Sequence, residues 1–385
     1  MRCSYDNGLR NLSGCGLSGM INLQGKRVNG EAIIRSIELM HERSNGMGGG
    51  FAAYGVYPEH ANDYAFHVMY YSPEARDKTE ALLDTAFESV LDEPLPTRQV
   101  DGVKDAPILR RYFLRPRPVA LQESAFPTEE DFVLSKVMKI NGDVDDAYVF
   151  SSGKNMGTFK AVGYAEDVGR FYRLDEYLAH CWISHARFPT NTPGWWAGAH
   201  PFTLLDWAVV HNGEISSYGI NRRYLEMFGY RCTMLTDTEV MAYLLDLLLR
   251  RHQLPIEVAA KVMSAPFWKK IDNLPEAERE LYKRLRQVYS SALVNGPFAI
   301  VFAWSGGMVG LNDRVKLRPL VAARAGEYLY LSSEESGIRA MCEEPPEVVW
   351  SPKAGEPVIG RLGDKAVYGE PDSQTIKQRK YVFAK

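Results

Sequence analysis

The sequence predicts a layered α+β fold for this chain of 385 residues. Strand-like segments run from 179 to 211, helical periodicity dominates 221–293, and short apolar strands return over 296–362. Strands and helices that are grouped along the chain favour sheets covered by helices over an alternating βαβ array. The elements are taken below in chain order.

The N-terminal part predicts a strand, a helix and a second strand. Residues 15–21 are small and apolar, which is typical of a buried strand. Apolar residues at helical spacing follow over 30–42. A glycine-rich turn at 46–50 leads into a strand at 51–56. This glycine turn precedes a strand and opens no helix, so it does not match a dinucleotide-binding motif.

The next segment predicts an inserted subdomain at about 58–135. Residues 64–71 alternate like a strand, 74–91 form an amphipathic helix, and 108–114 are apolar and aromatic. Prolines between 94 and 127 interrupt its later part. Beyond it, strands at 148–151 and 159–163 flank a turn, and later strands are expected at 298–304, 328–332 and 348–350.

Composition limits the classes of function. The net charge of −3, from 45 basic and 48 acidic residues, gives no overall field for nucleic acid or an anionic membrane. The apolar stretches are too short to span a bilayer, and residues 1–14 contain no signal-like apolar segment. Five scattered cysteines without a CxxC pair predict a cytoplasmic chain with no disulfide framework, zinc site or iron–sulfur cluster of its own.

Cys15 is the first candidate for chemistry. A thiolate is the strongest side-chain nucleophile at neutral pH, but the thiol needs a base. If Cys15 were the first residue, its own α-amine, with a pKa of about 7.7–8.0, would provide that base. Taken alone, however, Cys15 is more typical of an ordinary buried cysteine in a strand.

Three further motifs could bind a substrate or stabilise charge. Arg187, at a strand end, suits a carboxylate, although a surface arginine fits equally well. Asn212 and Gly213 follow an apolar strand and form either a plain turn or an oxyanion hole. Asp237 lies in Thr236-Asp237-Thr238-Glu239, which reads as a helix capping box but could also place a carboxylate in a pocket.

Together these motifs resemble the class II glutamine amidotransferases, and most closely the amidotransferase domain of glutamate synthase. The resemblance rests on Cys15-Gly16-Leu17-Ser18-Gly19, on the segment from His185 to Thr192, on His200-Pro201-Phe202 and His211-Asn212-Gly213-Glu214-Ile215, and on 313–319 and 332–334. It implies an α+β, four-layer αββα N-terminal-nucleophile hydrolase sandwich over 15–385, with the small α/β insertion at about 58–135.

The resemblance also implies roles for individual residues. Cys15 would attack the side-chain amide of glutamine and form a γ-glutamyl thioester, while Asn212 and Gly213 would stabilise the oxyanion. Arg187 would bind the α-carboxylate and Asp237 the α-ammonium. Substrate contacts are also expected from Thr190, in the arginine segment, and from Arg43, in Met40-His41-Glu42-Arg43, which resembles the family's early His-Arg-Gly segment with one extra residue.

Residues 1–14 precede Cys15, and glutamate synthases carry such a leader, so we expect cleavage between Gly14 and Cys15. The chain shows no flavin-binding barrel, cysteine cluster or glycine-repeat domain, which fits a separate amidotransferase subunit of an archaeal-type, split glutamate synthase. FMN and an iron–sulfur cluster would then lie on a partner, the catalytic synthase subunit. Three alternatives stay open: supply of ammonia to a different amination enzyme, hydrolysis of another amide, or a non-catalytic glutamine-binding subunit.

Overall fold

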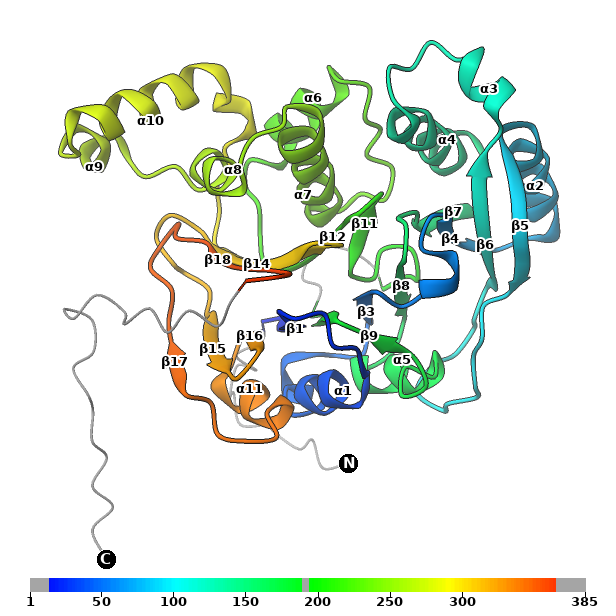
Figure 1. Ribbon diagram of the computed structural model, residues 1–385, viewed down its shortest axis with the longest axis horizontal. Coiled ribbons are helices and arrows are strands. Elements are labelled where there is room, and N and C mark those ends of the chain that lie inside the picture. The colour runs from blue at the N-terminus through cyan, green and yellow to red at the C-terminus, as the bar shows by residue number, and fades with distance from the viewer. Residues whose placement is uncertain (1–13, 189–193, 365–385) are drawn as a thin grey trace, which may run out of the picture.

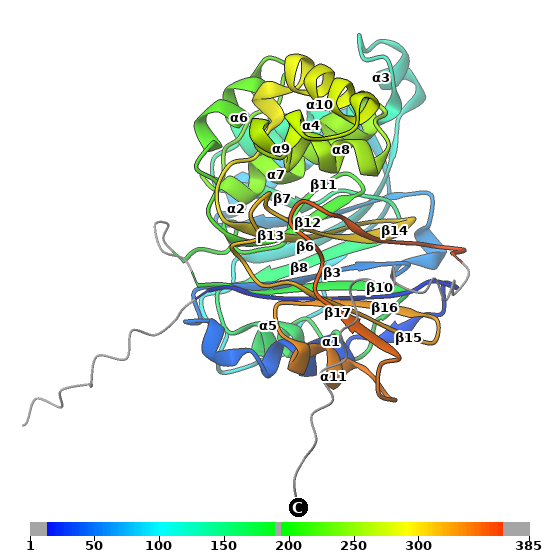
Figure 2. The ribbon, with the colours of Figure 1, turned by 90° about the vertical axis from the view of Figure 1, so that its left-hand side faces the viewer.

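Two central β-sheets lie face to face between two layers of helices in the computed structural model, which describes residues 14–188 and 194–364 (Figures 1 and 2). The seven-stranded sheet has the order β17-β15-β16-β1-β10-β3-β8, and the five-stranded sheet has the order β11-β12-β13-β14-β18. The layered α+β class expected from the sequence is therefore confirmed, as an αββα sandwich.

The strands of the first sheet are β1 (Gly16–Asn22), β3 (Gly49–Tyr54), β8 (Met156–Ala161), β10 (Cys181–Ala186), β15 (Val321–Ala325), β16 (Tyr328–Ser332) and β17 (Val348–Trp350). Those of the second are β11 (Phe202–Leu204), β12 (Trp207–Gly213), β13 (Phe298–Trp304), β14 (Gly307–Asn312) and β18 (Val358–Arg361). A short pair, β2 (Val28–Asn29) and β9 (Leu178–Ala179), stands apart from both.

The helices fall into two groups that cover opposite outer faces (Figure 2). The first sheet is covered by α1 (Glu31–Glu38), α5 (Ala165–Phe171) and α11 (Glu335–Met341). The second is covered by α6 (Tyr218–Glu226), α7 (Asp237–Leu245) and α8 (Ile256–Met263), with α9 (Trp268–Asp272) and α10 (Glu276–Val288) beyond them. The helical region expected over 221–293 is thus confirmed.

Close packing of the two sheets explains the small residues of β1. Every residue of β1 is buried. A methyl group added at Gly19 would lie 2.8 Å from the sulfur of Met308 and 3.1 Å from a methyl of Val301, both on the opposite sheet. Apolar side chains from the facing strands fill the space between the sheets, among them Leu17, Ile21, Ile183, Val210, Ala299 and Leu331.

A third sheet, with the order β5-β6-β4-β7, forms a separate lobe beside the sandwich (Figure 1). Its strands are β4 (Tyr64–Tyr70), β5 (Phe87–Pro94), β6 (Ile108–Pro116) and β7 (Ala147–Ser151), accompanied by helices α2 (Pro73–Ala86), α3 (Pro118–Gln122) and α4 (Glu129–Asp143). The lobe departs from the chain between β3 and β8, which pair with each other. It is therefore inserted between two neighbouring strands.

Two expectations for this lobe need correction. The helix expected over 74–91 ends at Ala86, because Phe87–Pro94 pairs along β6 as a strand. The range of about 58–135 is also too short, since α4 and β7 extend the lobe to Ser151. β7 is short and separated in sequence, and only its pairing with β4 assigns it to this sheet.

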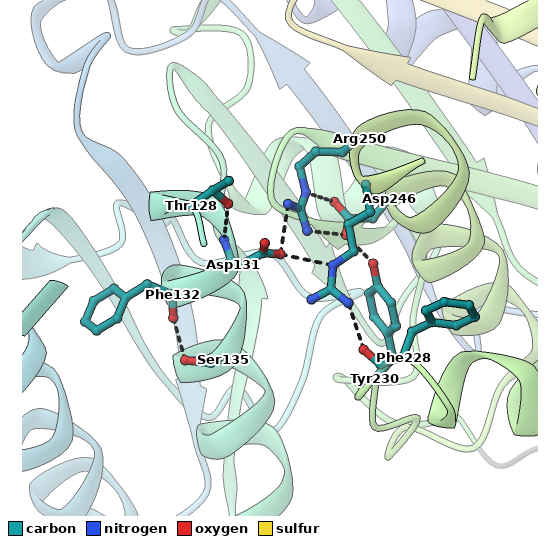
Figure 3. A network of polar contacts seen from close by, with 9 residues as sticks. Thr128, Asp131, Phe132, Ser135, Phe228, Tyr230, Asp246 and Arg250 are labelled. Carbon is teal, nitrogen blue, oxygen red and sulfur yellow. Dashed lines mark hydrogen bonds and ion pairs between the residues drawn. The ribbon is translucent and has the colours of Figure 1, made fainter. Parts of the chain in front are cut away.

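A buried ionic network joins the lobe to the helical layer (Figure 3). Asp131 of α4 accepts bonds from Arg250 and Arg251, each at 3.0 Å, and Arg250 also binds Asp246 at 2.6 Å. The hydroxyl of Tyr230 donates to Asp246 at 2.6 Å. Asp246, Arg250 and Arg251 lie on a π-helical turn (Asp246–Arg251) that continues α7, so the lobe anchors the helix that begins at Asp237.

No helix in the described part of the chain has the length and apolar character that a transmembrane span requires.

Candidate active site

The register of β1 and β10 brings the first candidate residues together. Gly16 pairs with Ala186 in antiparallel register, so Cys15 and Arg187 extend from adjacent strand ends. Both line a cavity of about 260 Å³ at the edge of the two sheets. The cavity is completed by Phe188, His200, His211, Gly213, Glu214, Ile215, Tyr218, Leu235, Thr236, Asp237 and Thr238.

The sulfur of Cys15 is held in a half-buried position at the wall of this cavity. The backbone N–H of Phe188 donates to Sγ at 3.3 Å. Burial raises the pKa of the Cys15 thiol, and the nearby Asp237 adds to the rise, whereas the Phe188 N–H and the charge of Arg187 oppose it. The balance is a raised pKa in the chain that still carries residues 1–14. In this form Cys15 is therefore a protonated, weakly nucleophilic thiol at neutral pH.

Arg43 holds the backbone of Cys15 in place. Its Nε donates to the Cys15 carbonyl oxygen at 3.3 Å, and its Nη1 pairs with Glu334 at 2.9 Å. A methyl group added at Gly14 would lie 3.5 Å from Arg43 Nη2 and 3.7 Å from Asn212 Oδ1. Arg43 therefore fixes the backbone of Cys15 and lies close to Gly14, and it is not among the residues that line the cavity.

Arg187 is almost fully buried, with 3% of its surface exposed. Its backbone is fixed on both sides, because its N–H donates to the Gly48 carbonyl at 2.9 Å and its carbonyl accepts from the Ser44 hydroxyl at 3.0 Å. Burial lowers the pKa of the guanidinium, and the opposite charges of Cys15 and Asp237 counteract this effect. A buried cation in a cavity is suited to binding an anionic group such as a carboxylate.

Asn212 and Gly213 end β12, the strand of the second sheet nearest the cavity. The side-chain Nδ2 of Asn212 is buried and has no hydrogen-bond partner among the described residues. A buried amide donor of this kind is costly unless a ligand satisfies it. Gly213 has φ = 138° and a Cβ there would lie 1.8 Å from the Pro297 carbonyl oxygen, so only glycine fits. The plain-turn interpretation of Asn-Gly does not explain the orphan amide.

Asp237 opens α7 and is held from behind. Its Oδ2 accepts the Ile215 backbone N–H at 2.9 Å, and its Oδ1 accepts the Thr238 hydroxyl at 3.3 Å. Burial raises the pKa of this carboxyl, but His211, the Ile215 N–H and Thr238 together lower it below its ordinary value. Asp237 is therefore an anion that faces the cavity, 20% exposed, close to Arg187 and Cys15.

The capping box expected at this helix forms only in part. Thr236 caps α7 by accepting the Thr238 N–H at 3.3 Å. Glu239 does not reach back to Thr236; it accepts the backbone N–H groups of Thr233 and Met234 at 2.9 and 3.0 Å. Glu239 thereby fixes the loop that leads into Asp237.

One predicted residue, Thr190, lies outside the described residues. Four of the others line the cavity: Cys15, Arg187, Gly213 and Asp237. Arg43 contacts the backbone of Cys15, and Asn212 lies near Gly14. Sequence reasoning missed Phe188, Thr238 and His200. The only signal for them was their position next to Arg187, next to Asp237 and in His200-Pro201, respectively.

In the described ranges, no group of three or more His, Cys, Asp and Glu side chains is arranged to hold a metal ion.

Comparisons with known proteins agree on one family. Residues 99–350 match the family described as glutamine amidotransferases class-II. A protein of Archaeoglobus fulgidus described as uncharacterized is 50% identical over 351 residues, covering 90% of this chain and 92% of its own length. A protein of Methanothermobacter thermautotrophicus, provisionally named a glutamine amidotransferase, is 26% identical over 86% of this chain and 94% of its own length.

A solved structure is similar to this chain at low identity. The glutamine phosphoribosylpyrophosphate amidotransferase of B. subtilis, complexed with ADP and GMP, matches with a TM-score of 0.45 and 15% identity. The match covers 90% of this chain and 47% of that one, so the chain spans about half the length of that protein. The family match includes Arg187, Asn212 and Asp237 but begins after Cys15, whose candidacy therefore rests on the site geometry.

The raised pKa of Cys15 predicts slow alkylation in the chain that retains residues 1–14. We expect the iodoacetamide reaction rate at Cys15, followed by peptide mass spectrometry, to rise with a midpoint above the ordinary thiol pKa of 9.0. The same chain in urea, where burial is lost, should show an ordinary midpoint. A folded-state midpoint at or below the value in urea would contradict the environment described for Cys15.

Proposed function

The chain belongs to the class II glutamine amidotransferases, and we propose that it hydrolyses the side-chain amide of L-glutamine to glutamate and ammonia, with Cys15 as the nucleophile once residues 1–14 are removed. The observation that carries the proposal is one cavity lined by a thiol, a buried cation and an anion, next to Asn212, whose buried amide donor has no partner among the described residues. These are the four groups that amide hydrolysis on an amino acid requires.

The charges of the cavity match the headgroup of an amino acid. Arg187 supplies the cation for the α-carboxylate, and Asp237 supplies the anion for the α-ammonium. Arg187 and Asp237 line the same cavity as Cys15. A substrate that these two charges hold by its headgroup therefore presents its side chain to the sulfur. This pairing favours glutamine over an amide without an amino-acid headgroup.

The chemistry follows from the groups around Cys15. Cleavage of the Gly14–Cys15 bond creates an α-amine, whose neutral form accepts the thiol proton. The thiolate attacks the amide carbon, and the Asn212 amide and the Gly213 N–H stabilise the oxyanion. Collapse of this intermediate breaks the C–N bond, and the α-amine returns its proton to the departing nitrogen, which leaves as ammonia. Water then hydrolyses the γ-glutamyl thioester and restores the thiol.

The form that retains residues 1–14 suits a second function, the binding of glutamine without hydrolysis. With residues 1–14 attached, Cys15 has no α-amine and its thiol pKa is raised, while Arg187 and Asp237 are already in place. That form binds glutamine without hydrolysing it. Removal of the leader therefore decides between an enzyme and a glutamine-binding subunit.

The cleaved chain should begin at Cys15 and form a thioester. Intact mass of the protein purified from its native cells should equal that of 15–385, and rapid acid quench with L-glutamine should add a γ-glutamyl group. Cys15→Ala should abolish both the adduct and ammonia release. A purified chain that retains Met1 and forms no adduct, or a Cys15→Ala variant that still releases ammonia, would overturn the catalytic proposal.

Replacement of Asn212 by Ala should lower kcat for glutamine hydrolysis by about a hundredfold or more, the usual loss for one oxyanion donor. The binding of glutamine should change little, because the donor acts mainly on the transition state. Asn273→Ala is the control, since its amide donates only to the Lys269 carbonyl on the distant helix α9. Equal kcat values for wild type and Asn212→Ala would refute the role.

We further propose that the ammonia passes to the catalytic subunit of a glutamate synthase, which carries FMN and an iron–sulfur cluster and aminates 2-oxoglutarate. The support is the likeness of the segments at 185–192, 200–215 and 313–319 to the amidotransferase part of that enzyme. A different amination enzyme is the alternative acceptor.

The acceptor can be identified by isotope transfer. The tagged chain is purified from its native cells with its partners and incubated with amide-¹⁵N glutamine, 2-oxoglutarate and a reductant. The proposal expects a flavin-containing partner and ¹⁵N in the α-amino group of new glutamate. Release of all label as free ammonium, or its appearance in another product, would exclude glutamate synthase.

A further inference from the structure

Buried histidines converge on the hydroxyl of Thr238, behind the carboxylate of Asp237. His200 Nε2 lies 2.6 Å and His211 Nδ1 lies 3.1 Å from Thr238 Oγ1. The ring of His185 stacks on His200 with centroids 4.2 Å apart. Thr238 is fully buried, and the three histidines are at most 5% exposed. None of these four residues has a part in the hydrolysis described above.

The proton of each ring can be assigned from its partners. His185 Nε2 faces a carbonyl oxygen, which only accepts, so this nitrogen carries the proton and Nδ1 is bare. Burial lowers the pKa of His185 to about 3 and that of His200 far below its ordinary value, so both rings are neutral. A neutral ring has one N–H and one bare nitrogen.

The unpartnered nitrogens agree with this assignment. His185 Nδ1, His200 Nδ1 and His211 Nε2 are buried and have no partner among the described residues. A buried N–H without an acceptor is the rarer and costlier case, so these three atoms are the bare nitrogens. His200 Nε2 and His211 Nδ1 are then the protonated atoms, and both donate to the Thr238 oxygen.

The proton of Thr238 consequently has one destination. Its oxygen accepts from two imidazoles, which use both lone pairs, and its hydroxyl donates to Asp237 Oδ1 at 3.3 Å. On the other side Asp237 Oδ2 accepts the Ile215 N–H. The carboxylate is therefore held by two hydrogen-bond donors behind it, and His211 Nδ1 lies 3.6 Å from the same Oδ1 that Thr238 contacts. The cavity side of the carboxylate is left for a cation.

We infer that Thr238, itself oriented by His200 and His211, is the positioning residue that aims Asp237 at the substrate's α-ammonium and so makes the site selective for amino acids. The inference rests on the proposed function, because it assumes that Asp237 binds the ammonium. Thr238 touches Asp237 and not the reacting atoms, so its loss should weaken headgroup recognition and leave the chemistry at Cys15 unchanged.

The test compares two substrates that differ only in the α-amino group: L-glutamine and glutaramate, which lacks it. In the full, processed protein, Thr238→Val keeps the shape of the side chain and removes the hydroxyl. We expect kcat/KM for glutamine to fall by about 10- to 100-fold, mainly through KM, the loss typical of a hydrogen bond to a charged group. For glutaramate the change should stay within about threefold, because no ammonium is bound.

Two matched variants separate positioning from damage to the fold. Thr238→Ser keeps the hydroxyl and should retain the wild-type preference for glutamine. Thr233→Val also removes a threonine hydroxyl near α7, but one without a hydrogen-bond partner in the described ranges, and should leave both substrates unaffected. Equal losses on glutamine and glutaramate in Thr238→Val, or no loss on either, would overturn the inference.

Asp237→Asn in the same assay separates the role of Thr238 from the binding of the α-ammonium by Asp237. If Asp237→Asn lowers kcat/KM for glutamine selectively but Thr238→Val does not, only the role of Thr238 is refuted. If Asp237→Asn affects both substrates equally, the assignment of Asp237 to the ammonium fails, and the inference about Thr238 fails with it.

Discussion

The antiparallel pairing of β1 with β10 is the constraint on which the site depends. With Gly16 opposite Ala186, the first residue before β1 and the first residue after β10 are neighbours, so a thiol and a guanidinium from positions 172 apart in sequence meet at one sheet edge. A shift of β1 by one residue would place a different residue opposite Arg187 and turn the side chains of β1 to the other face of the sheet. The buried, small-residue surface of β1 prevents such a shift, since Gly19 leaves no room against Met308 and Val301.

Both sheets place polar groups near the cavity: Asn212 and His211 lie on β12, His185 lies on β10, and His200 precedes β11. Asn212 Nδ2 and three imidazole nitrogens are buried near the cavity without partners in the described part of the chain. In a merely structural region such atoms would lower stability for no return. These atoms differ in kind. The Asn212 nitrogen is a hydrogen-bond donor, which suits a developing oxyanion. The imidazole atoms are unprotonated nitrogens, and the N–H groups of the same rings already donate to Thr238 or to the His211 carbonyl.

In the proposed mechanism, the Cys15 thiol can lose its proton to a neighbouring base only after residues 1–14 are removed, because that base is the α-amine of Cys15. In the uncleaved chain, burial raises the pKa of Cys15, and Arg43 Nε donates to the Cys15 carbonyl oxygen at 3.3 Å. Arg187 and Asp237 already line the cavity in this form, so in the proposed mechanism cleavage would add only the α-amine. The inserted lobe contacts the other end of the same helix, because Asp131 binds Arg250 and Arg251 in the π-helical turn that continues α7. These contacts help to fix the position of the helix that begins at Asp237.

Several features follow from the sequence by itself. Apolar runs separated by helical periodicity determine the α+β layering, because burying an apolar strand face requires a second layer. The order of Cys15, Arg187, Asn212, Gly213 and Asp237 was sufficient to place them in one family and one expected site. The residue types also limit the chemistry, since a thiol, a guanidinium and a carboxylate have few alternative uses in one cavity.

Other features were decided only by tertiary structure. Residues 87–91 have a helical pattern but form a strand, because pairing with β6 outweighs local propensity, and β7 joins the lobe only through β4. The contact of Phe188 with the Cys15 thiol and the contacts of His200 and His211 with Thr238 join atoms from distant segments. The physical reason is the same in each case: hydrogen bonds and desolvation act over a few ångströms in space, and a linear pattern does not record which groups share that space.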